Sequence, residues 1–575
     1  MRFFWPVWLI ITFGGAICVA SALGFREAGR DRKQIVRASK LTLAWPHVQM
    51  HGIAAALILL GVFIASYIAM TLIWEDFAYY DNEYFTLNTL KGHDLGLSIF
   101  KNEGRFFPLA GQEFNLVRHF TDTVAGYHVL PTVQLLIFFY ILLVVDESLS
   151  TTARATLAVL TLLTPSVLTS FNGLIFSSER NVLFFLVCLL LSVRQFEQTR
   201  SIAWAVAAVV SAQIMIYYKE TAFLLLLGFA IARLILRCKN GRYAKWGYGR
   251  LWDKESRLDL CFAFLAVLYF LYYFAEMRFQ ANVNYAETAR QLRSELVLGY
   301  LRIDLLAWLF VAVALGRIFL ILRHQVAPLL LWDGVALGGV AFFFAYLYLG
   351  IFGIYYLAPV DLIAVLYVGR FGVLSWKKMR SWSRIPVLLL AFTVLFQDIL
   401  VSAYTVFERK NVIHGKAEVA SVVVARFRNG AGHPLRLFFP FANPYTIMEF
   451  AAYLDHRGVP VEGAAGEAVG PDGLVLAAKA SSEDGPCVEW VTIQCHAVKR
   501  PAPGDLVIVL PDDIVPLAET SVYRDRGELL FLYEPVPHVP DWLHSLFDSL
   551  YIGTTRLRHT KNPDRWMDAS VTIWK

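Results

Sequence analysis

Four carboxylates alternate with aromatic side chains in the segment WEDFAYYDNEYF, residues 74–85, which directly follows an apolar run. If a helix continues past this point, Asp76, Tyr80 and Glu83 share one face, because their spacing is i, i+4 and i+7. Carboxylates at a membrane surface can accept protons or bind a cation. The alternative is the water-exposed end of a membrane helix, where acidic and aromatic residues are common.

The loop that contains this segment, residues 74–128, spans about 55 residues without a clear helix or strand pattern. That length exceeds what a connector needs and favours a functional loop. Further along it, the segment NEGRFFPL places a glycine directly before Arg105. The glycine allows close backbone approach, and a guanidinium can hold a phosphate through two hydrogen bonds. An ion pair between Arg105 and Glu103 is the alternative, and the sequence leaves both open.

Two more charged couples lie directly beside apolar runs. FNGLIFSSER ends in Glu179 and Arg180, and YYKET places Lys219 and Glu220 between two predicted helices. Charges at or below the depth of the lipid headgroups are costly unless they are paired or functional. Pairing within each couple is the structural alternative. For Lys219 and Glu220 a function is favoured, because the turn is too short to lift them into bulk water.

The elements that must position these residues are membrane helices. The chain has 575 residues, of which 57% are hydrophobic and 17% charged, with a mean hydropathy of +0.52. This composition excludes an ordinary soluble protein and indicates an integral membrane protein. The segment IYYLAPVDL, with Tyr355, Tyr356 and Asp361, resembles a helix interrupted near Pro359. The alternative, an ordinary proline kink, is favoured. Apolar runs predict about 12 transmembrane helices, at residues 3–23, 52–73, 129–146, 154–170, 181–195, 201–217, 221–236, 258–276, 299–322, 326–348, 352–372 and 385–404.

Positive charge alternates between the connecting segments. Basic segments belong in the cytoplasm, so the loop 74–128 and everything after about residue 405 are predicted to lie outside. A signal peptide cleaved near Ala20–Ala22 is the alternative for the N-terminus. Cleavage would place six basic residues on the outer face and invert every later loop, so a retained first helix is predicted. The segments assigned to the cytoplasm are those around residues 26–40, 194–200, 237–257 and 377–384.

A second domain is predicted at the C-terminus. Residues 1–405 form the transmembrane domain with the outward loop 74–128, and residues 406–575 form an extracytoplasmic α/β domain. The strand-like runs LRLFFP, VEWVTI, LVIVL and ELLFLY and the helical pattern NPYTIMEFAAYLDHRG support this assignment. Cys487 and Cys495 bracket CVEWVTIQC, and either a disulfide, which requires an oxidising compartment, or two free thiols fit the sequence.

Common chemical motifs are missing from the sequence. The scattered histidines form no HExxH pattern, and no metal is assigned to them. No GxxxxGK[ST], GxGxxG or GxSxG stands in a strand-to-helix context, which disfavours nucleotide binding and a nucleophile-elbow hydrolase. No nucleic-acid partner is expected.

With Glu75 and Asp76 at the outer end of an early helix, a long first outward loop, many helices and an extracytoplasmic α/β domain, the chain resembles the GT-C superfamily of polyprenyl-phosphate-sugar-dependent glycosyltransferases. The resemblance covers nearly the whole chain in architecture. It implies transfer of a sugar from a polyprenyl phosphate to a hydroxyl of a glycan, lipid or protein. It also implies a bacterial inner (plasma) membrane, with the C-terminal domain outside the cytoplasm.

The resemblance also implies roles for the charged residues. Phosphate leaves without a general acid, so one carboxylate acting as base on the acceptor hydroxyl suffices. Asp76 is the predicted base, with Glu75, Asp81 and Glu83 as alternates. Asp81 and Glu83 could instead hold a divalent cation, the one cofactor that this interpretation allows.

Cations must hold the departing phosphate as its charge grows. Arg105, Arg180 and Lys219 are predicted for that role, and Glu220 is predicted to position Lys219 or the acceptor. The alternative function is a transporter or flippase for a lipid-linked saccharide. Such proteins place polar groups at the membrane midplane in broken helices, whereas the conspicuous charges here cluster at the predicted outer face.

Overall fold

The structure is a computed structural model that describes part of the chain and divides it into two compact units. The membrane unit comprises the described residues of 1–67, 96–113 and 130–402, and the C-terminal unit those of 68–95, 114–129 and 403–575. The described residues are 61, 88–101, 104–174, 177–238, 254–277, 293–351, 353–376, 378–429, 435–440, 444–460, 474–479, 495–498, 500–510, 522–523, 525–533 and 569–575.

Apolar helices form the membrane unit, and several end where the sequence offers a cap. Ser150 accepts a hydrogen bond from the Ala153 amide at the start of α7, and Gly350 ends α16 with a φ of 74°. The helices are α6 (Val124–Val144), α7 (Thr151–Leu163), α8 (Pro165–Asn172), α9 (Ser177–Thr199), α10 (Ile202–Tyr218), α11 (Ala222–Cys238), α12 (Lys254–Met277), α14 (Arg293–Ile303), α15 (Leu305–Leu322), α16 (Leu330–Leu349), α17 (Ala358–Trp376) and α18 (Ser381–Asn429).

By length and composition, seven helices in the described part of the chain can cross a membrane, or up to eight if the bent pair α7–α8 counts as one span. Large apolar side chains such as Phe264, Phe319 and Phe392 are exposed on α12, α15 and α18, as expected of surfaces that face lipid. The chain is therefore an integral membrane protein with several helical spans. The predicted spans 3–23 and 52–73 lie outside the described residues, apart from Gly61, so the count of twelve stays a prediction.

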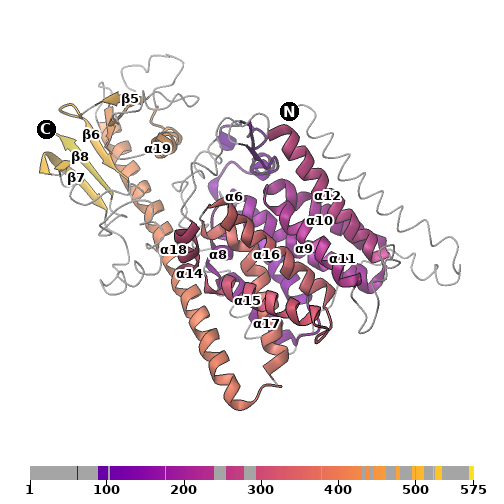
Figure 1. Ribbon diagram of the computed structural model, residues 1–575. Coiled ribbons are helices and arrows are strands. Elements are labelled where there is room, and N and C mark those ends of the chain that lie inside the picture. The colour runs from indigo at the N-terminus through magenta and orange to yellow at the C-terminus, as the bar shows by residue number, and fades with distance from the viewer. Residues whose placement is uncertain are drawn as a thin grey trace. The chain divides into compact units, whose positions relative to one another are not determined.

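Helices α9, α10, α11, α12 and α16 lie side by side in one bundle (Figure 1). Glycines allow the closest of these contacts. A Cβ added to Gly338 of α16 would lie 2.7 Å from the Leu225 carbonyl oxygen of α11, and one added to Gly228 would lie 3.1 Å from the Gly338 Cα. Small residues let membrane helices approach closely, and these two glycines bring α11 against α16.

Pro359 produces a helix start rather than the kink that the sequence predicts. A 3₁₀ helix, η5 (Ile354–Leu357), precedes it, and α17 begins at Ala358. Pro359 therefore occupies the first turn of α17, where its missing amide hydrogen costs no intrahelical hydrogen bond.

A small mixed sheet forms the centre of the C-terminal unit, in the order β5-β4-β3-β6-β8-β7. Strands β3 to β6 pair in parallel, whereas β8 pairs antiparallel with β6 and β7. The predicted order of strand, helix and strand is confirmed, but the second strand is β4 and not the predicted VPV run, of which Val459 and Pro460 belong to no strand. The elements are β3 (Leu435–Phe439), α19 (Pro444–His456), β4 (Leu474–Lys479), β5 (Cys495–Val498), β6 (Leu506–Val509), β7 (Gly527–Tyr533) and β8 (Ala569–Trp574).

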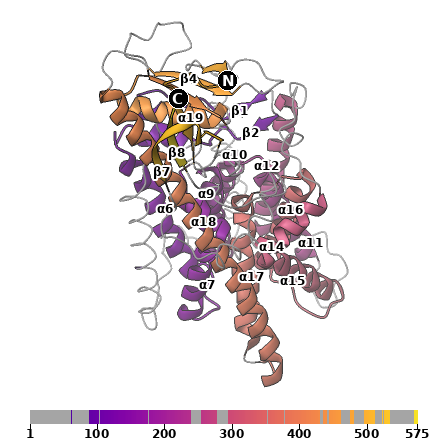
Figure 2. The same ribbon diagram turned by 90° about the vertical axis from the view of Figure 1, so that its left-hand side faces the viewer.

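The core of this unit lies between the sheet and two helices. Val423 of α18 and Phe450 of α19 pack with Leu437 of β3 and Ile508 of β6, all fully buried. Helices α18 and α19 thus cover one face of the sheet. Figure 2 labels both helices and the strands β4, β7 and β8 of this sheet.

Candidate functional site

The predicted catalytic residues Glu75, Asp76, Asp81 and Glu83 lie outside the described residues, as does Cys487. The roles of these carboxylates, a cation at Asp81 and Glu83, and a disulfide to Cys495 therefore stay predictions. Within the described ranges, no group of three His, Cys, Asp or Glu residues is arranged to hold a metal ion.

Arg105 lies in a short hairpin of the membrane unit. Strands β1 (Ile99–Phe100) and β2 (Arg105–Phe106) pair antiparallel, and Gly104 between them has a φ of 67°, which favours glycine. The Arg105 Nε lies 3.4 Å from an oxygen of Glu220, and its guanidinium carbon lies 4.5 Å from the centre of the Phe107 ring. The hairpin therefore brings a predicted phosphate ligand to the turn between α10 and α11.

Lys219 ends α10 in an extended conformation, and α11 starts at Ala222, so the turn is short, as predicted. The Lys219 Nζ donates to Glu179 Oε1 at 2.7 Å. It also lies 4.6 Å from the centre of the Tyr356 ring and 5.9 Å from that of Phe107. The ammonium thus faces one carboxylate and the π faces of aromatic rings, which attract cations.

Arg180 is held in the interior of the membrane unit. Its Nε donates to Gln134 at 3.0 Å, its Nη1 donates to the Gly173 carbonyl at 3.2 Å, and its Nη2 lies 3.6 Å from Glu113. Only 1% of the side chain is exposed. A phosphate has little access to such a guanidinium. Of the three predicted phosphate ligands, Arg105 is the most exposed, at 19% of its side chain, and Lys219 is 9% exposed.

The ion pairs join residues of different segments. Lys219 pairs with Glu179, Arg180 with Glu113, and Arg105 with Glu220. These contacts differ from the pairing within adjacent couples that the sequence offered as an alternative. The predicted phosphate ligands and Glu220 therefore belong to one network, which binds α9 to the turn before α11 and to the loop that carries Arg105.

Burial and charge act in opposite directions on the pKa of Lys219. Burial disfavours the ammonium, but Glu179, Tyr356, Tyr346 and Glu220 together outweigh it and raise the pKa. Lys219 therefore stays positively charged at any physiological pH. A permanent cation suits the binding of an anion and does not suit proton transfer.

Glu113 and Glu220, the carboxylates at the two borders of the network, each have a buried Oε2 atom without a hydrogen-bond partner among the described residues. Burial raises the pKa of Glu113, despite the nearby guanidinium of Arg180. The Glu220 Oε2 atom is buried and accepts no hydrogen bond from any described residue. It is thus able to accept a hydrogen bond from a hydroxyl group, as the predicted role in positioning an acceptor requires.

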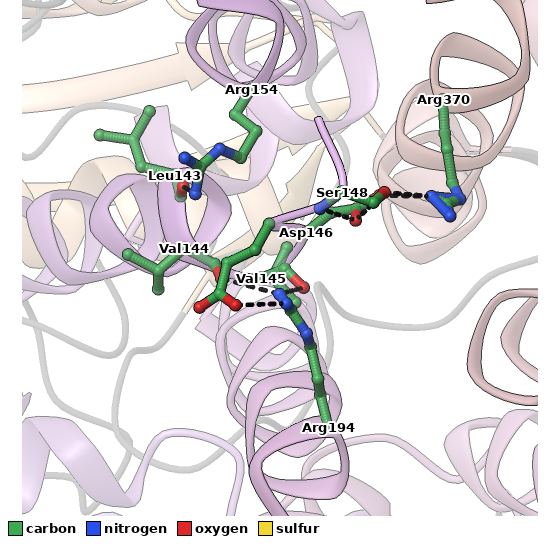
Figure 3. Close-up of polar contacts among 9 residues, drawn as sticks. Leu143, Val144, Val145, Asp146, Ser148, Arg154, Arg194 and Arg370 are labelled. Carbon is green, nitrogen blue, oxygen red and sulfur yellow. Dashed lines mark hydrogen bonds and ion pairs between the residues drawn. The ribbon is translucent and has the colours of Figure 1, made fainter. Parts of the chain in front are cut away.

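A second set of charged contacts lies at the opposite end of α9, about 21 Å along the helix from Arg180. Arg194 donates to the carbonyl oxygen of Val144, 3.0 Å away, at the end of α6 (Figure 3). Arg154 donates to the Leu143 carbonyl at 2.6 Å, and Arg370 pairs with Asp146 at 2.8 Å. Guanidinium groups from α7 and α9 thus satisfy the last carbonyls of α6, and one from α17 pairs with the acid that follows it, at the end predicted to face the cytoplasm.

Several residues of the network escaped sequence reasoning. Glu113 and Asn181 hold each other through a 3.0 Å hydrogen bond, and Phe107 and Tyr356 flank the ammonium of Lys219. The sequence gives no sign that Phe107, directly after β2, or Tyr356, in η5, faces a cation. Only Glu113 could have been found from the sequence, because a carboxylate directly before Phe114 and a short apolar stretch is unusual.

Comparison with protein-family models finds no match to this chain, and neither does comparison with curated proteins. The class that the structure itself defines is an integral membrane protein with several helical spans and a small C-terminal mixed sheet.

Proposed function

We propose that the chain is a membrane glycosyltransferase of the GT-C type, which moves a sugar from a polyprenyl phosphate to a hydroxyl of a cell-envelope glycan, lipid or protein. One observation carries the proposal: the permanently charged Lys219 and the adjacent Arg105 lie together at the end of the membrane helices that is predicted to face outward. The Arg105 guanidinium carbon lies 4.5 Å and the Lys219 Nζ 5.9 Å from the centre of the Phe107 ring, and we infer that one anionic group binds both cations.

The residues suit the departure of a phosphate. As the bond from sugar to phosphate breaks, negative charge grows on the phosphate, and nearby fixed cations stabilise it. Glu220 offers a buried, unoccupied carboxylate oxygen to an acceptor hydroxyl. The base that takes the hydroxyl proton is the predicted Asp76, with Glu75, Asp81 and Glu83 as alternates. Each transfer yields one polyprenyl phosphate and one proton.

The test is incubation of the purified protein, reconstituted in lipid, with a panel of polyprenyl-phosphate sugars and envelope acceptors. Release of polyprenyl phosphate that depends on the acceptor supports the proposal. Asp76→Asn should stay folded and inserted but lose sugar transfer. Wild-type activity in that variant would remove Asp76 as the base, and no release with any donor would remove the function.

A transporter or flippase for a lipid-linked saccharide is the second candidate, and a different observation favours it. The chain bends by 70° between α7 and α8, which makes this pair a broken span, and broken helices are typical of transporters. Movement of the labelled lipid across a vesicle membrane, without release of polyprenyl phosphate, would identify this function.

A further inference from the structure

The buried carboxylates discussed so far share one feature, a basic partner. Glu113 and Glu179 have Arg180 and Lys219, and Asp146 has Arg370. Two more acids of the membrane unit are completely buried and also paired. Asp333 lies 2.7 Å from Arg317, and Asp259 lies between Arg233 and Arg237 at 2.7 and 2.9 Å. The cation beside a paired buried acid favours its ionised form and opposes the effect of burial.

Three other buried acids lie against one another instead. Asp304, Asp361 and Asp398 are 6%, 2% and 4% exposed. Asp304 and Asp361 are within hydrogen-bonding reach of each other, and Asp398 is near enough to both for their charges to repel. Within the described part of the chain, no Lys, Arg or His forms an ion pair with any of the three.

The cluster lies where three helices begin. Asp304 caps α15 by accepting a hydrogen bond from the Ala307 amide at 2.8 Å. Ser166, in the first turn of α8, donates a hydrogen bond to Asp361, which itself lies in the first turn of α17. Helix N-termini stabilise negative charge, so the site can retain one ionised carboxylate. It offers no comparable compensation for two or three.

Helix α18 supplies the third acid. The Gln397 side chain accepts from the Leu305 amide at 2.9 Å, and Ser402 donates to the Leu163 carbonyl at 2.7 Å. These contacts hold that stretch of α18 against the helix breaks at α7 and α15. Asp398 lies between them, and its Oδ1 atom is buried without a hydrogen-bond partner among the described residues. The Oδ1 atom of Asp361 is likewise buried without a hydrogen-bond partner among the described residues.

Carboxylates in contact at low dielectric cannot all be ionised, because their repulsion is strong and unscreened. Something must neutralise part of the charge. The described residues contain no arrangement of acids that could hold a metal ion. A proton, in contrast, removes one charge and turns one oxygen into a donor for the carboxylate beside it. It therefore fits the contact between Asp304 and Asp361.

We propose that Asp304, Asp361 and Asp398 form a proton-binding site of the membrane unit, in which at least one carboxyl stays protonated at neutral pH and donates a hydrogen bond to its neighbour. Other polar groups near the site include the Ser166 hydroxyl and the hydroxyl of Tyr300 on α14, which donates to the Ile351 carbonyl at 3.3 Å. None of them is a cation. The inference does not depend on glycosyl transfer.

Infrared difference spectroscopy on the purified protein in lipid tests the site. Wild-type protein at neutral pH should show the carbonyl stretch of a protonated carboxyl group in a dry environment, and labelling with carboxyl-labelled aspartate should shift it. Asp361→Asn should lose that band. The matched control is Asp333→Asn, whose acid is equally buried but paired with Arg317, so the band should remain.

The outcomes separate the alternatives. A neutral-pH spectrum without the band, or a band unchanged in Asp361→Asn, would overturn the proposal. A band that appears only when sodium is replaced by choline would also overturn it, because the ligand would then be a metal cation. Asn resembles a protonated Asp, so Asp304→Asn and Asp398→Asn serve if Asp361→Asn fails to fold. Failure of all three to fold would contradict the proposal, since neutral substitutes for a neutral acid should be tolerated.

Discussion

Lys219 and Glu179 each compensate the buried charge of the other, and mutations can separate this contribution to stability from a role in function. Glu179 is 7% exposed, and its partner Lys219 is 9% exposed, so each is buried with the other as its compensating charge. The Coulomb attraction in such a pair roughly offsets the cost of removing both ions from water. The stability of the network therefore depends on keeping both partners or removing both.

Lys219→Met should destabilise the protein by about 3–5 kcal/mol, because it leaves the Glu179 carboxylate buried without a cation. Adding Glu179→Gln to it should restore most of that stability. Thermal unfolding in detergent, with all three variants compared with the wild type, measures both effects. A single variant as stable as the double would show that water or lipid headgroups reach Glu179.

The same double variant separates stability from function. If Lys219 binds the donor phosphate, Lys219→Met with Glu179→Gln should fold normally yet use the lipid-linked donor poorly. Unchanged donor kinetics in the double variant would return Lys219 to a structural role. Lys101 pairs with Glu276 at 3.0 Å and is well exposed, so Lys101→Met is the matched control. Removing such an exposed pair should cost less than about 1 kcal/mol.

Glu113 should make the stability of the protein depend on pH. Burial raises its pKa above the ordinary value of 4.5, so the folded protein holds this proton more tightly than the unfolded chain. The stability that the proton contributes is fully present below 4.5 and is lost as the pH rises through the raised pKa. Glu113→Gln should remove this contribution. Unfolding temperatures measured across the acidic and neutral range should then fall less steeply with pH in the variant; equal slopes would exclude Glu113 as the source.

The sequence identified which charged residues are candidates for a functional site, but it did not show which residues they pair with. The positions of Arg105, Lys219 and Glu220 beside apolar runs identified them as unusual charges. Their partners come from segments up to 115 positions away in the chain, as Arg105 and Glu220 show. Such contacts depend on how the helices pack, which the order of residues along one segment does not contain. Asp361 illustrates the same limit: the sequence identified it as part of the segment around Pro359, and nothing in that segment indicates that Asp304 and Asp398 lie near it.

At the scale of elements, the contact between α11 and α16 depends on glycine. Gly338→Ala should separate the two helices, because the new Cβ would approach backbone atoms of α11, which cannot move aside as a side chain can. Overpacking of this kind typically costs about 1–3 kcal/mol. Thermal unfolding of the variant in detergent measures the loss.

Gly316 of α15 supplies the control for that substitution. A Cβ added there meets nothing within 4 Å among the atoms of the structure. Gly316→Ala should therefore stabilise the protein by up to about 1 kcal/mol, since alanine favours a helix interior. If both variants behaved alike, the close approach of α11 and α16 would not be the cause of the effect.

Helices were predicted correctly where one long apolar run corresponds to one helix. The long apolar runs at 181–195 and 326–348 correspond to α9 and α16 because their composition alone requires burial or lipid. The run 154–170 was read as one straight span, whereas Thr164 ends α7 and Pro165 starts α8. Hydropathy does not detect such a break. Pro165 could have indicated it, because proline is common at the first position of a helix. Strands β4, β5 and β8 were missed, because their pairing depends on distant residues, and the predicted strand VEWVTI lies outside the described residues.

At the scale of the whole molecule, the two ends of the membrane unit differ in how they use charge. At one end Arg105 and Lys219 lie at aromatic rings and carboxylates beside the hairpin, whereas at the other Arg154, Arg194 and Arg370 bind the carbonyls of α6 and the acid that follows it. The second end belongs with the basic segments that are predicted to stay in the cytoplasm. Function on the outer face requires this orientation.

Reporter fusions decide the orientation. A bacterial alkaline phosphatase joined after Lys575 should be active, and a green fluorescent protein at the same place should stay dark, because the first folds only outside the cytoplasm and the second only within it. Fusions after Lys378, in the basic segment between α17 and α18, should give the opposite pattern. The positive-inside rule depends on charges close to the ends of spans, and Lys378, Arg380 and Arg384 meet that condition. The reverse pattern at both sites would place Lys219 and Arg105 in the cytoplasm, where a donor presented from the outer leaflet could not reach them.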